Sequence, residues 1–134
     1  MIRTFVDSGV LIEAFRGSSA IAASAPAILN DVNREFATSE FVRLEILPKP
    51  AFQRRMVEVA FYNAFFVTVA QSAPVTRALI RLAMRRAEEF GLSAVDALHI
   101  AAAETTGSAE LITTERPASP LSRVTSIQVI SIRH

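Results

Sequence analysis

The stretch LSAVDALHIAAAETTGSAELITT, residues 92–114, places a buried helix directly before a strand and thereby indicates the fold class. Ser93 is a suitable N-cap, and the alanine and aliphatic residues after it are typical of a buried helix. The run from Glu110 to Thr114 then has the apolar and β-branched residues of a short strand. A helix followed at once by a strand predicts an α/β architecture.

The same alternation of strands and helices extends outward from this stretch to both ends of the chain. Strands are predicted at residues 2–7, 35–39, 66–70, 110–114 and 126–134. Helices are predicted at residues 8–15, 19–34 with a break near Pro26, 40–47 after the cap Ser39, 51–66, 74–91 and 93–103. The alternation predicts a three-layer α/β/α sandwich with a mostly parallel central sheet. No repeat, low-complexity tract or linker divides the sequence, so we expect one domain over residues 1–134.

The composition excludes several classes of site. The chain has a net charge of +1, which is too balanced to indicate a nucleic-acid binder by charge alone. It contains no cysteine, so disulfides and thiolate metal sites are excluded, and two histidines do not suffice for a histidine-rich zinc site. A bound metal would therefore be a hard, oxygen-liking ion such as Mg²⁺ or Mn²⁺.

The N-terminal residues do not have the pattern of a secretory signal, because Asp7 interrupts the first apolar run too early. No stretch of the sequence reaches the roughly 18 uninterrupted apolar residues of a membrane-spanning helix. We therefore expect a cytoplasmic protein with no membrane partner.

Acidic side chains stand at positions where an α/β fold binds ligands. Asp7 ends the first predicted strand and Glu115 follows the strand ELITT, and ligands of open parallel sheets bind outside the carboxyl ends of the strands. Asp96 lies in an apolar helix with no lysine or arginine within four residues on either side. A buried ionised carboxylate is costly unless it is paired or coordinated, so Asp96 indicates a functional cleft.

Each acid also has a structural interpretation. Asp7 and Glu115 could be solvated loop residues or helix caps. Glu45, the fourth candidate, could pair with Lys49 at i+4, which stabilises a helix by about 0.2 to 0.5 kcal/mol. Glu40 competes with Glu45, although an acid in the first turn of a helix is already favoured by the helix dipole.

Four segments occur in the order TFVDSGVLI, SEFVRLEIL, GLSAVDALHIAAA and LITTERP, and together they extend over nearly the whole chain. They resemble the four acidic motifs of the PIN-domain ribonucleases, a family that includes the VapC toxins of bacterial toxin–antitoxin pairs. Ser8 and Thr114 match positions in these motifs that a hydroxyl residue fills in support of the site. The resemblance implies Mg²⁺ or Mn²⁺ as the cofactor and, as the metal-binding and catalytic acids, Asp7, Glu45, Asp96 and Glu115.

The sequence departs from the family pattern at Glu115, where the family usually has aspartate. Glutamate is one methylene longer, so this ligand is expected to bind through water or to shift a second metal. His99 recurs in the third motif, and we expect it to be structural rather than catalytic. Arg116 is a candidate phosphate contact, with a solvent-exposed loop arginine as the alternative. The basic stretch with Arg81, Arg85 and Arg86 is expected to form the solvent-exposed face of an amphipathic helix rather than an RNA-binding surface.

The resemblance implies a divalent-metal-dependent endoribonuclease, the toxin of a toxin–antitoxin pair. The alternative is a catalytically weak PIN-like domain that mainly binds RNA or protein. A response-regulator-like module is a third reading, but it needs a lysine at a late strand and the only lysine is Lys49. The implied partners are an RNA substrate, an antitoxin protein and a second copy of the chain in a homodimer. The aromatic residues Phe61, Tyr62, Phe65 and Phe66 are expected in the core. The alternative is that part of them lines a groove for a partner.

Overall fold

The computed structural model describes residues 1–17 and 23–133, and within these ranges five strands form one sheet. The strands are β1 (Ile2–Val6), β2 (Arg34–Ser39), β3 (Gln71–Ala73), β4 (Glu110–Thr113) and β5 (Gln128–Ser131). They lie in the order β3-β2-β1-β4-β5, and every neighbouring pair is parallel. The predicted parallel sheet is confirmed. This strand order differs from the 2-1-3-4-5 order of flavodoxin-like folds such as response regulators. The hypothesis of a response-regulator-like module is therefore excluded.

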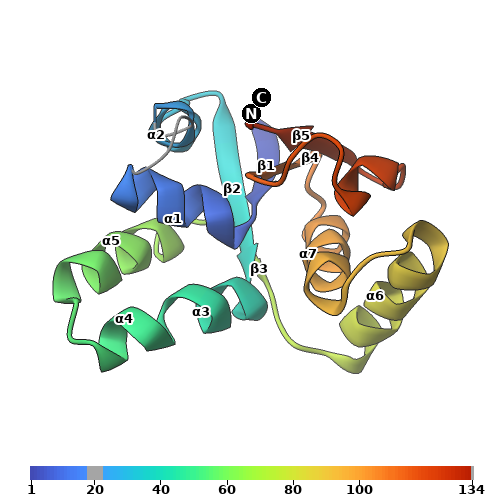
Figure 1. Cartoon of the computed structure of the whole chain (residues 1–134), viewed down its shortest axis with the longest axis horizontal. Helices are drawn as coiled ribbons and strands as arrows, with labels where there is room; N and C mark the ends of the chain where they lie inside the picture. Colours follow the sequence, from blue (N-terminus) through green and yellow to red (C-terminus); the bar gives the residue numbers. More distant parts are fainter. Residues whose placement is uncertain (18–22, 134) are drawn as a thin grey trace.

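Helices cover both faces of this sheet and complete the predicted three layers (Figure 1). The helices α6 and α7 lie on one side of the sheet, and α1, α2 and α5 lie on the other. Their bounds are α1 (Ser8–Arg16), α2 (Ser24–Leu29), α3 (Glu40–Ile46), α4 (Pro48–Phe52), α5 (Met56–Phe66), α6 (Arg77–Phe90) and α7 (Ala94–Thr105), and a 3₁₀ helix spans Pro120–Arg123.

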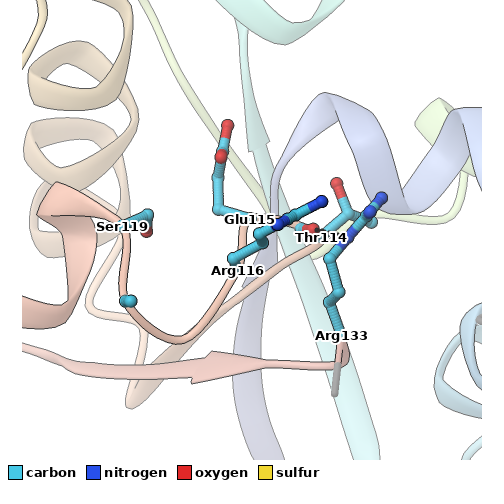
Figure 2. A pocket seen from close by; sticks show the side chains of 6 residues that line it. Thr114, Glu115, Arg116, Ser119 and Arg133 are labelled. Atoms are coloured by element: carbon cyan, nitrogen blue, oxygen red, sulfur yellow. Dashed lines mark hydrogen bonds between the residues drawn. The ribbon is translucent and has the colours of Figure 1, made fainter.

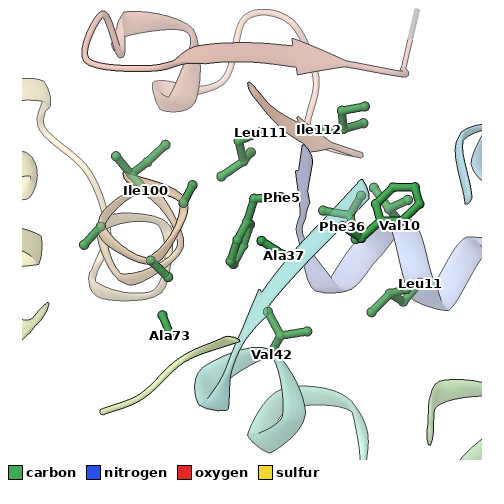
Figure 3. Close-up of a cluster of buried hydrophobic side chains, with 14 of the residues drawn as sticks. Phe5, Val10, Leu11, Phe36, Ala37, Val42, Ala73, Ile100, Leu111 and Ile112 are labelled. Carbon is green, nitrogen blue, oxygen red and sulfur yellow. The ribbon is translucent and has the colours of Figure 1, made fainter. Parts of the chain in front are cut away.

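The core fills both spaces between the sheet and its helices (Figure 3). Phe5 and Leu111 point toward Ile100 of α7, whereas Phe36 and Ile112 point toward the α1 side. All of these side chains except Phe36 are fully buried, and Phe36 retains only a small exposed fraction. The alternation along each strand follows from the two-residue period of β structure, in which successive side chains face opposite sides of the sheet.

The helix boundaries confirm the capping signals that the sequence shows. Ser39 Oγ accepts a hydrogen bond from the Val42 amide at 3.2 Å, and Ser93 Oγ accepts one from the Asp96 amide at 3.2 Å. Gly91 ends α6 in the left-handed conformation with φ of 66°, which glycine adopts without the steric cost of a Cβ.

Three predicted elements differ from the structure. The strand predicted at 66–70 is wrong, because α5 continues through Phe66 and β3 begins only at Gln71. Packing explains the difference, since the Phe65 ring lies 5.7 Å from the Phe36 ring and Val67 is left 83% exposed. The single helix predicted over 51–66 is divided in the structure, because α4 begins earlier, at Pro48, and ends at Phe52, and α5 begins only at Met56. Proline is tolerated at the first position of a helix such as α4. The helix predicted over 19–34 is confirmed only for α2, and residues 18–22 lie outside the described residues.

Because all strands are parallel, β1, β2 and β4 end at one edge of the sheet, called here the carboxyl edge. The helices α1 and α3 begin at this edge, directly after β1 and β2. The end of α7 lies beside the start of β1, where Arg3 Nη1 donates to the Thr106 carbonyl at 2.7 Å. The 12 residues of α7 span about 18 Å, so its first turn lies toward the carboxyl edge. No helix in the described ranges combines the length and apolar character needed to cross a lipid bilayer.

Candidate functional site

Asp7 lies at the centre of the carboxyl edge, between the end of β1 and the start of α1. Its Oδ1 caps α1 by accepting from the Val10 amide at 3.3 Å, and its Oδ2 accepts from Thr113 Oγ1 at 2.5 Å. The pKa of this carboxyl is raised from its ordinary value of 3.8 to about 6, chiefly by burial and to a smaller extent by the charge of Glu115. The hydrogen bonds and the His99 ring oppose these effects. Asp7 is thus a carboxylate whose charge costs energy in the folded protein unless a cation lies beside it.

Glu45 reaches the same edge from α3. Its Oε1 accepts from Ser8 Oγ at 2.5 Å and lies 2.7 Å from His99 Nε2. The hydrogen bond with His99 lowers the pKa of Glu45 most strongly, so the carboxylate stays ionised. Glu45 therefore does not form the i+4 pair with Lys49 that the sequence offered. Glu40 is exposed and pairs with Arg43 at 3.6 Å, so of the two glutamates it is Glu45 that faces the other acids.

Asp96 lies in the first turn of α7, three residues before His99 and therefore on the same face of the helix. Since His99 contacts Glu45, this face of α7 is turned toward α3 and the carboxyl edge. Asp96 is half-buried, and among the described residues its carboxylate has no hydrogen-bond or ion-pair partner. A structural ion pair for Asp96 is thus missing from the described part of the chain.

Glu115 lies at the end of β4, close enough to Asp7 for its charge to raise the Asp7 pKa. Its amide donates to Thr113 Oγ1 at 3.0 Å, and its carbonyl accepts a short hydrogen bond from Ser131 Oγ. Its carboxylate is exposed, as expected for a longer side chain at the mouth of a cleft. The backbone here is fixed by two strands, whereas the carboxylate is free to turn toward a ligand.

At the end of β4, the sequence predicted Thr114 as the residue that supports the site. In the structure it is Thr113 that donates a hydrogen bond to Asp7. Thr114 instead lies over Gly9, where an added Cβ would come within 2.1 Å of Thr114 Oγ1. A side chain at position 9 would therefore require Thr114 to move. Ser8 donates to Glu45, and His99 orients Glu45. The Nδ1 atom of His99 is buried without a partner in the described ranges.

A cavity of about 480 Å³ opens beside Glu115 (Figure 2). Thr114, Arg116 and Ser119 line it, and so does Arg133 from the segment after β5. Arg133 Nε donates to the Thr114 carbonyl at 2.8 Å. The sequence singled out Arg116 here but gave no sign of Arg133, because only the folded sheet brings the C-terminal segment beside β4.

The donor set suits a hard divalent ion, because every candidate ligand is a carboxylate oxygen. In residues 1–17 and 23–133, no three His, Asp or Glu side chains lie close enough together to surround one ion as they stand. Mg²⁺ usually keeps several waters and takes only one or two protein carboxylates, so this spacing is compatible with it. The residues present therefore fit a hydrated Mg²⁺ or Mn²⁺ near Asp7 better than an ion enclosed by the protein.

The fold and the site together define the class of protein: an α/β protein with a parallel sheet and acidic side chains at the carboxyl edge of that sheet. The chain belongs to the PIN domain family, which it matches over residues 4–118. No curated protein matches it significantly.

Solved structures share the fold at low sequence identity. A chain of VapBC2 from Rickettsia felis, bound to a DNA fragment from its promoter, is 11% identical with a TM-score of 0.73, covering 97% of this chain and 98% of that chain. DNA-bound VapBC from Salmonella typhimurium is also 11% identical, with a TM-score of 0.71 and coverage of 98% and 99%. VapC20 from Mycobacterium tuberculosis, a Sarcin-Ricin loop cleaving toxin, is 22% identical with a TM-score of 0.65 and coverage of 89% and 93%.

Proposed function

We propose that this protein is a divalent-metal-dependent endoribonuclease and the toxin of a toxin–antitoxin pair. The observation that carries the proposal is the environment of Asp7, a buried carboxylate with its pKa raised to about 6 at the edge where Glu45, Asp96 and Glu115 also lie. A nearby cation would offset the cost of ionising Asp7 in this environment. Membership of the PIN domain family supports nuclease chemistry for such a site.

In this proposal Asp7, Glu45, Asp96 and Glu115 would hold a hydrated ion, directly or through its waters, and the bound ion would supply an activated water and stabilise charge on the phosphoryl group. Thr113 orients Asp7 by donating to its Oδ2. Ser8 and His99 fix the Glu45 carboxylate in one direction by sharing its Oε1. Preorganised carboxylates of this kind do not have to reorient during the reaction, which is how a site contributes electrostatic stabilisation.

The proposed partners follow from the solved structures of the same fold. Two of them are VapBC structures bound to DNA, and VapC20 is described as a toxin that cleaves the Sarcin-Ricin loop. We therefore propose RNA as the substrate, an antitoxin protein as a partner and a homodimer as the assembly. Apolar side chains left exposed on α6 and α7, among them Met84 and Val95, are available for contacts between copies.

The test of the proposed function is incubation of the purified protein with a defined pool of single-stranded and structured RNAs. We expect cleavage with Mg²⁺ or Mn²⁺ and none with a chelator. Sequencing of the product ends would then give the preferred site. An intact pool in the presence of either ion, together with measurable RNA binding, would favour the alternative of a binding module in which Glu115 weakens the site.

Divalent ions are expected to raise the melting temperature, because they bind the folded protein and not the unfolded chain. At a hundred times its Kd an ion contributes about 2.7 kcal/mol, which corresponds to roughly 5–10 °C in Tm for a domain of this size. Asp7→Asn should raise the Tm of the metal-free protein by removing a costly charge, and it should reduce the response to Mg²⁺. Thermal scans of both proteins with Mg²⁺, Mn²⁺ and chelator measure this, and equal responses would remove Asp7 from the ion site.

The response to ions is also expected to depend on pH. The folded protein holds the Asp7 proton more tightly than the unfolded chain does, because burial raises the Asp7 pKa from 3.8 to about 6. Without ions, the contribution of Asp7 to stability therefore falls as the pH rises through this window. An ion competes with the proton, so its effect on Tm should be small at about pH 5 and complete above about pH 7.

A further inference from the structure

The cavity beside Glu115 is bordered by two positive side chains that approach it from different strands. Arg116 follows β4 and Arg133 follows β5, and both extend toward Thr114, whereas the Glu115 side chain extends away from Thr114 (Figure 2). Two unpaired guanidinium groups that line one cavity make its electrostatic potential positive, which favours an anionic ligand. The arrangement therefore indicates a site for an anionic ligand.

Neither arginine is neutralised by the described part of the chain. Arg116 is exposed and has no hydrogen-bond or ion-pair partner there. Arg133 is half-buried and uses only its Nε, which donates to the Thr114 carbonyl, so both of its terminal Nη nitrogens stay available. Arginines that serve the fold elsewhere in the chain differ, since Arg34 and Arg86 each contact two acidic residues.

The backbone holds Arg133 in this position. Ser131 Oγ accepts from the Arg133 amide at 3.1 Å and donates to the Glu115 carbonyl. The same short segment therefore ties down the backbone of Glu115 and carries Arg133 to the cavity. A guanidinium anchored through Nε loses little freedom on binding, and its fixed fork of donors matches the oxygens of a phosphate.

We propose that Arg116 and Arg133 form a phosphate-binding subsite that holds a backbone phosphate of the RNA next to the one that is cleaved. The ligand class is a phosphodiester of single-stranded RNA, and this identification rests on the proposed function of the neighbouring acids. The subsite lies beside Glu115, so a strand bound there passes over the carboxyl edge. Arg116 lies within residues 4–118, over which the chain matches its family, and Arg133 lies beyond them.

The subsite is tested by binding a short fluorescent single-stranded RNA to the full chain in the presence of a chelator, which prevents metal-dependent cleavage. Fluorescence anisotropy gives the Kd at salt concentrations from about 50 to 200 mM for the wild type, Arg116→Gln, Arg133→Gln and the double variant. Arg85→Gln is the matched control, because Arg85 is an exposed arginine on α6 away from the cavity. Thermal scans of every variant accompany the titrations.

Each single variant is expected to weaken RNA binding about tenfold, as for the loss of one charge-assisted contact. Each should also lower the slope of log K against log salt by about 0.7, the contribution of one phosphate of a single strand. The double variant should lose about twice that slope, and Arg85→Gln should lose none. Two RNAs of different sequence should give the same losses, because phosphate contacts carry no sequence information.

Unchanged slopes for Arg116→Gln and Arg133→Gln would overturn the subsite, and so would an equal loss in Arg85→Gln, which would indicate general electrostatic attraction. Loss of binding only in Arg133→Gln together with a lower Tm would make Arg133 a purely structural residue and would also overturn it. Arg116 donates no hydrogen bond in the described chain, so Arg116→Gln should fold normally. Its RNA binding therefore tests the subsite even if Arg133→Gln folds poorly.

The cleavage assay separates this inference from the proposed function. If the wild type binds RNA through both arginines but does not cleave it with Mg²⁺ or Mn²⁺, the nuclease proposal fails and the phosphate subsite stands. If the wild type cleaves RNA and the two variants keep its KM and its salt slope, the subsite alone fails.

Discussion

Asp96→Asn is expected to abolish metal-dependent RNA cleavage while the protein stays folded. Loss of a partner that only orients a metal ligand already costs about 10- to 100-fold in affinity or activity, so loss of the ligand itself should cost about a hundredfold or more. Asparagine keeps the size of the side chain and one carbonyl oxygen but removes the charge. In the described chain the Asp96 carboxylate has no partner that this change would leave unpaired.

The fold should tolerate this change because Asp96 contributes little to it. Ser93 caps α7 through the Asp96 amide, which asparagine retains. An acid in the first turn of a helix contributes about 0.3 to 1 kcal/mol through the helix dipole, and this is the largest loss expected in the absence of metal. A structural acid paired with a buried arginine would instead cost about 3 to 5 kcal/mol.

Thermal unfolding and RNA cleavage measured on the same preparation of Asp96→Asn decide between these roles. Glu40→Gln is the matched control, since Glu40 is an exposed acid whose ion-pair partner among the described residues is Arg43, and this variant should cleave like the wild type. Cleavage at the wild-type rate by Asp96→Asn would end the catalytic assignment of Asp96. A strongly lowered Tm with normal activity per folded molecule would show that Asp96 serves the fold.

Most of the fold could be predicted because the hydrophobic periods and caps agree with the tertiary structure. The exception is the segment 66–70, whose residues FVTVA have the β-branched and aromatic composition of a strand. Phe66 is nevertheless buried at the end of α5, and the helix continues because Phe65 packs on Phe36. Local composition does not contain this information, since the packing partner lies 29 residues earlier in the chain.

The candidate site was only partly visible in the sequence. Glu40 and Glu45 lie on one helix, about 140° apart around its axis, so only one of them can face the other acids. Which one does so depends on how α3 sits against α1 and α7, and the contacts with Ser8 and His99 decide for Glu45. Thr113 was missed because its bond to Asp7 depends on the register of β1 with β4 across more than a hundred residues.

Glu110 begins β4 at the edge of the sheet opposite to Asp7, where it joins three segments. It is almost fully buried and accepts from Thr4 Oγ1 at 2.8 Å and from Arg34 Nε at 2.9 Å. Arg34 in turn donates to Asp31 at 2.8 Å. The side chain of Glu110 therefore ties β4 to β1 and β2, and it has no contact with the acids at the carboxyl edge.

Glu110→Ala is expected to lower the free energy of unfolding by about 3 kcal/mol. Removal of one partner from a buried ion pair costs about 3 to 5 kcal/mol, and the lower end applies because Arg34 keeps Asp31. The corresponding fall in Tm is roughly 10 °C for a domain of this size. Glu35→Ala is the matched control, since Glu35 pairs with Arg3 at 3.0 Å but is about one-third exposed, and it should cost no more than about 1 kcal/mol.

The two variants are compared by denaturant unfolding and by RNA cleavage measured well below their Tm. Together these measurements distinguish residues that stabilise one edge of the sheet from residues that act in cleavage at the opposite edge. Glu110→Ala should cleave RNA like the wild type per folded molecule, because its partners Thr4, in the middle of β1, and Arg34, at the start of β2, lie away from the carboxyl edge. It thus forms the counterpart of Asp96→Asn, which should be stable and inactive. A cost below 1 kcal/mol would mean that water replaces Glu110 around Arg34, and a loss of cleavage without unfolding would mean that the two edges of the sheet are coupled.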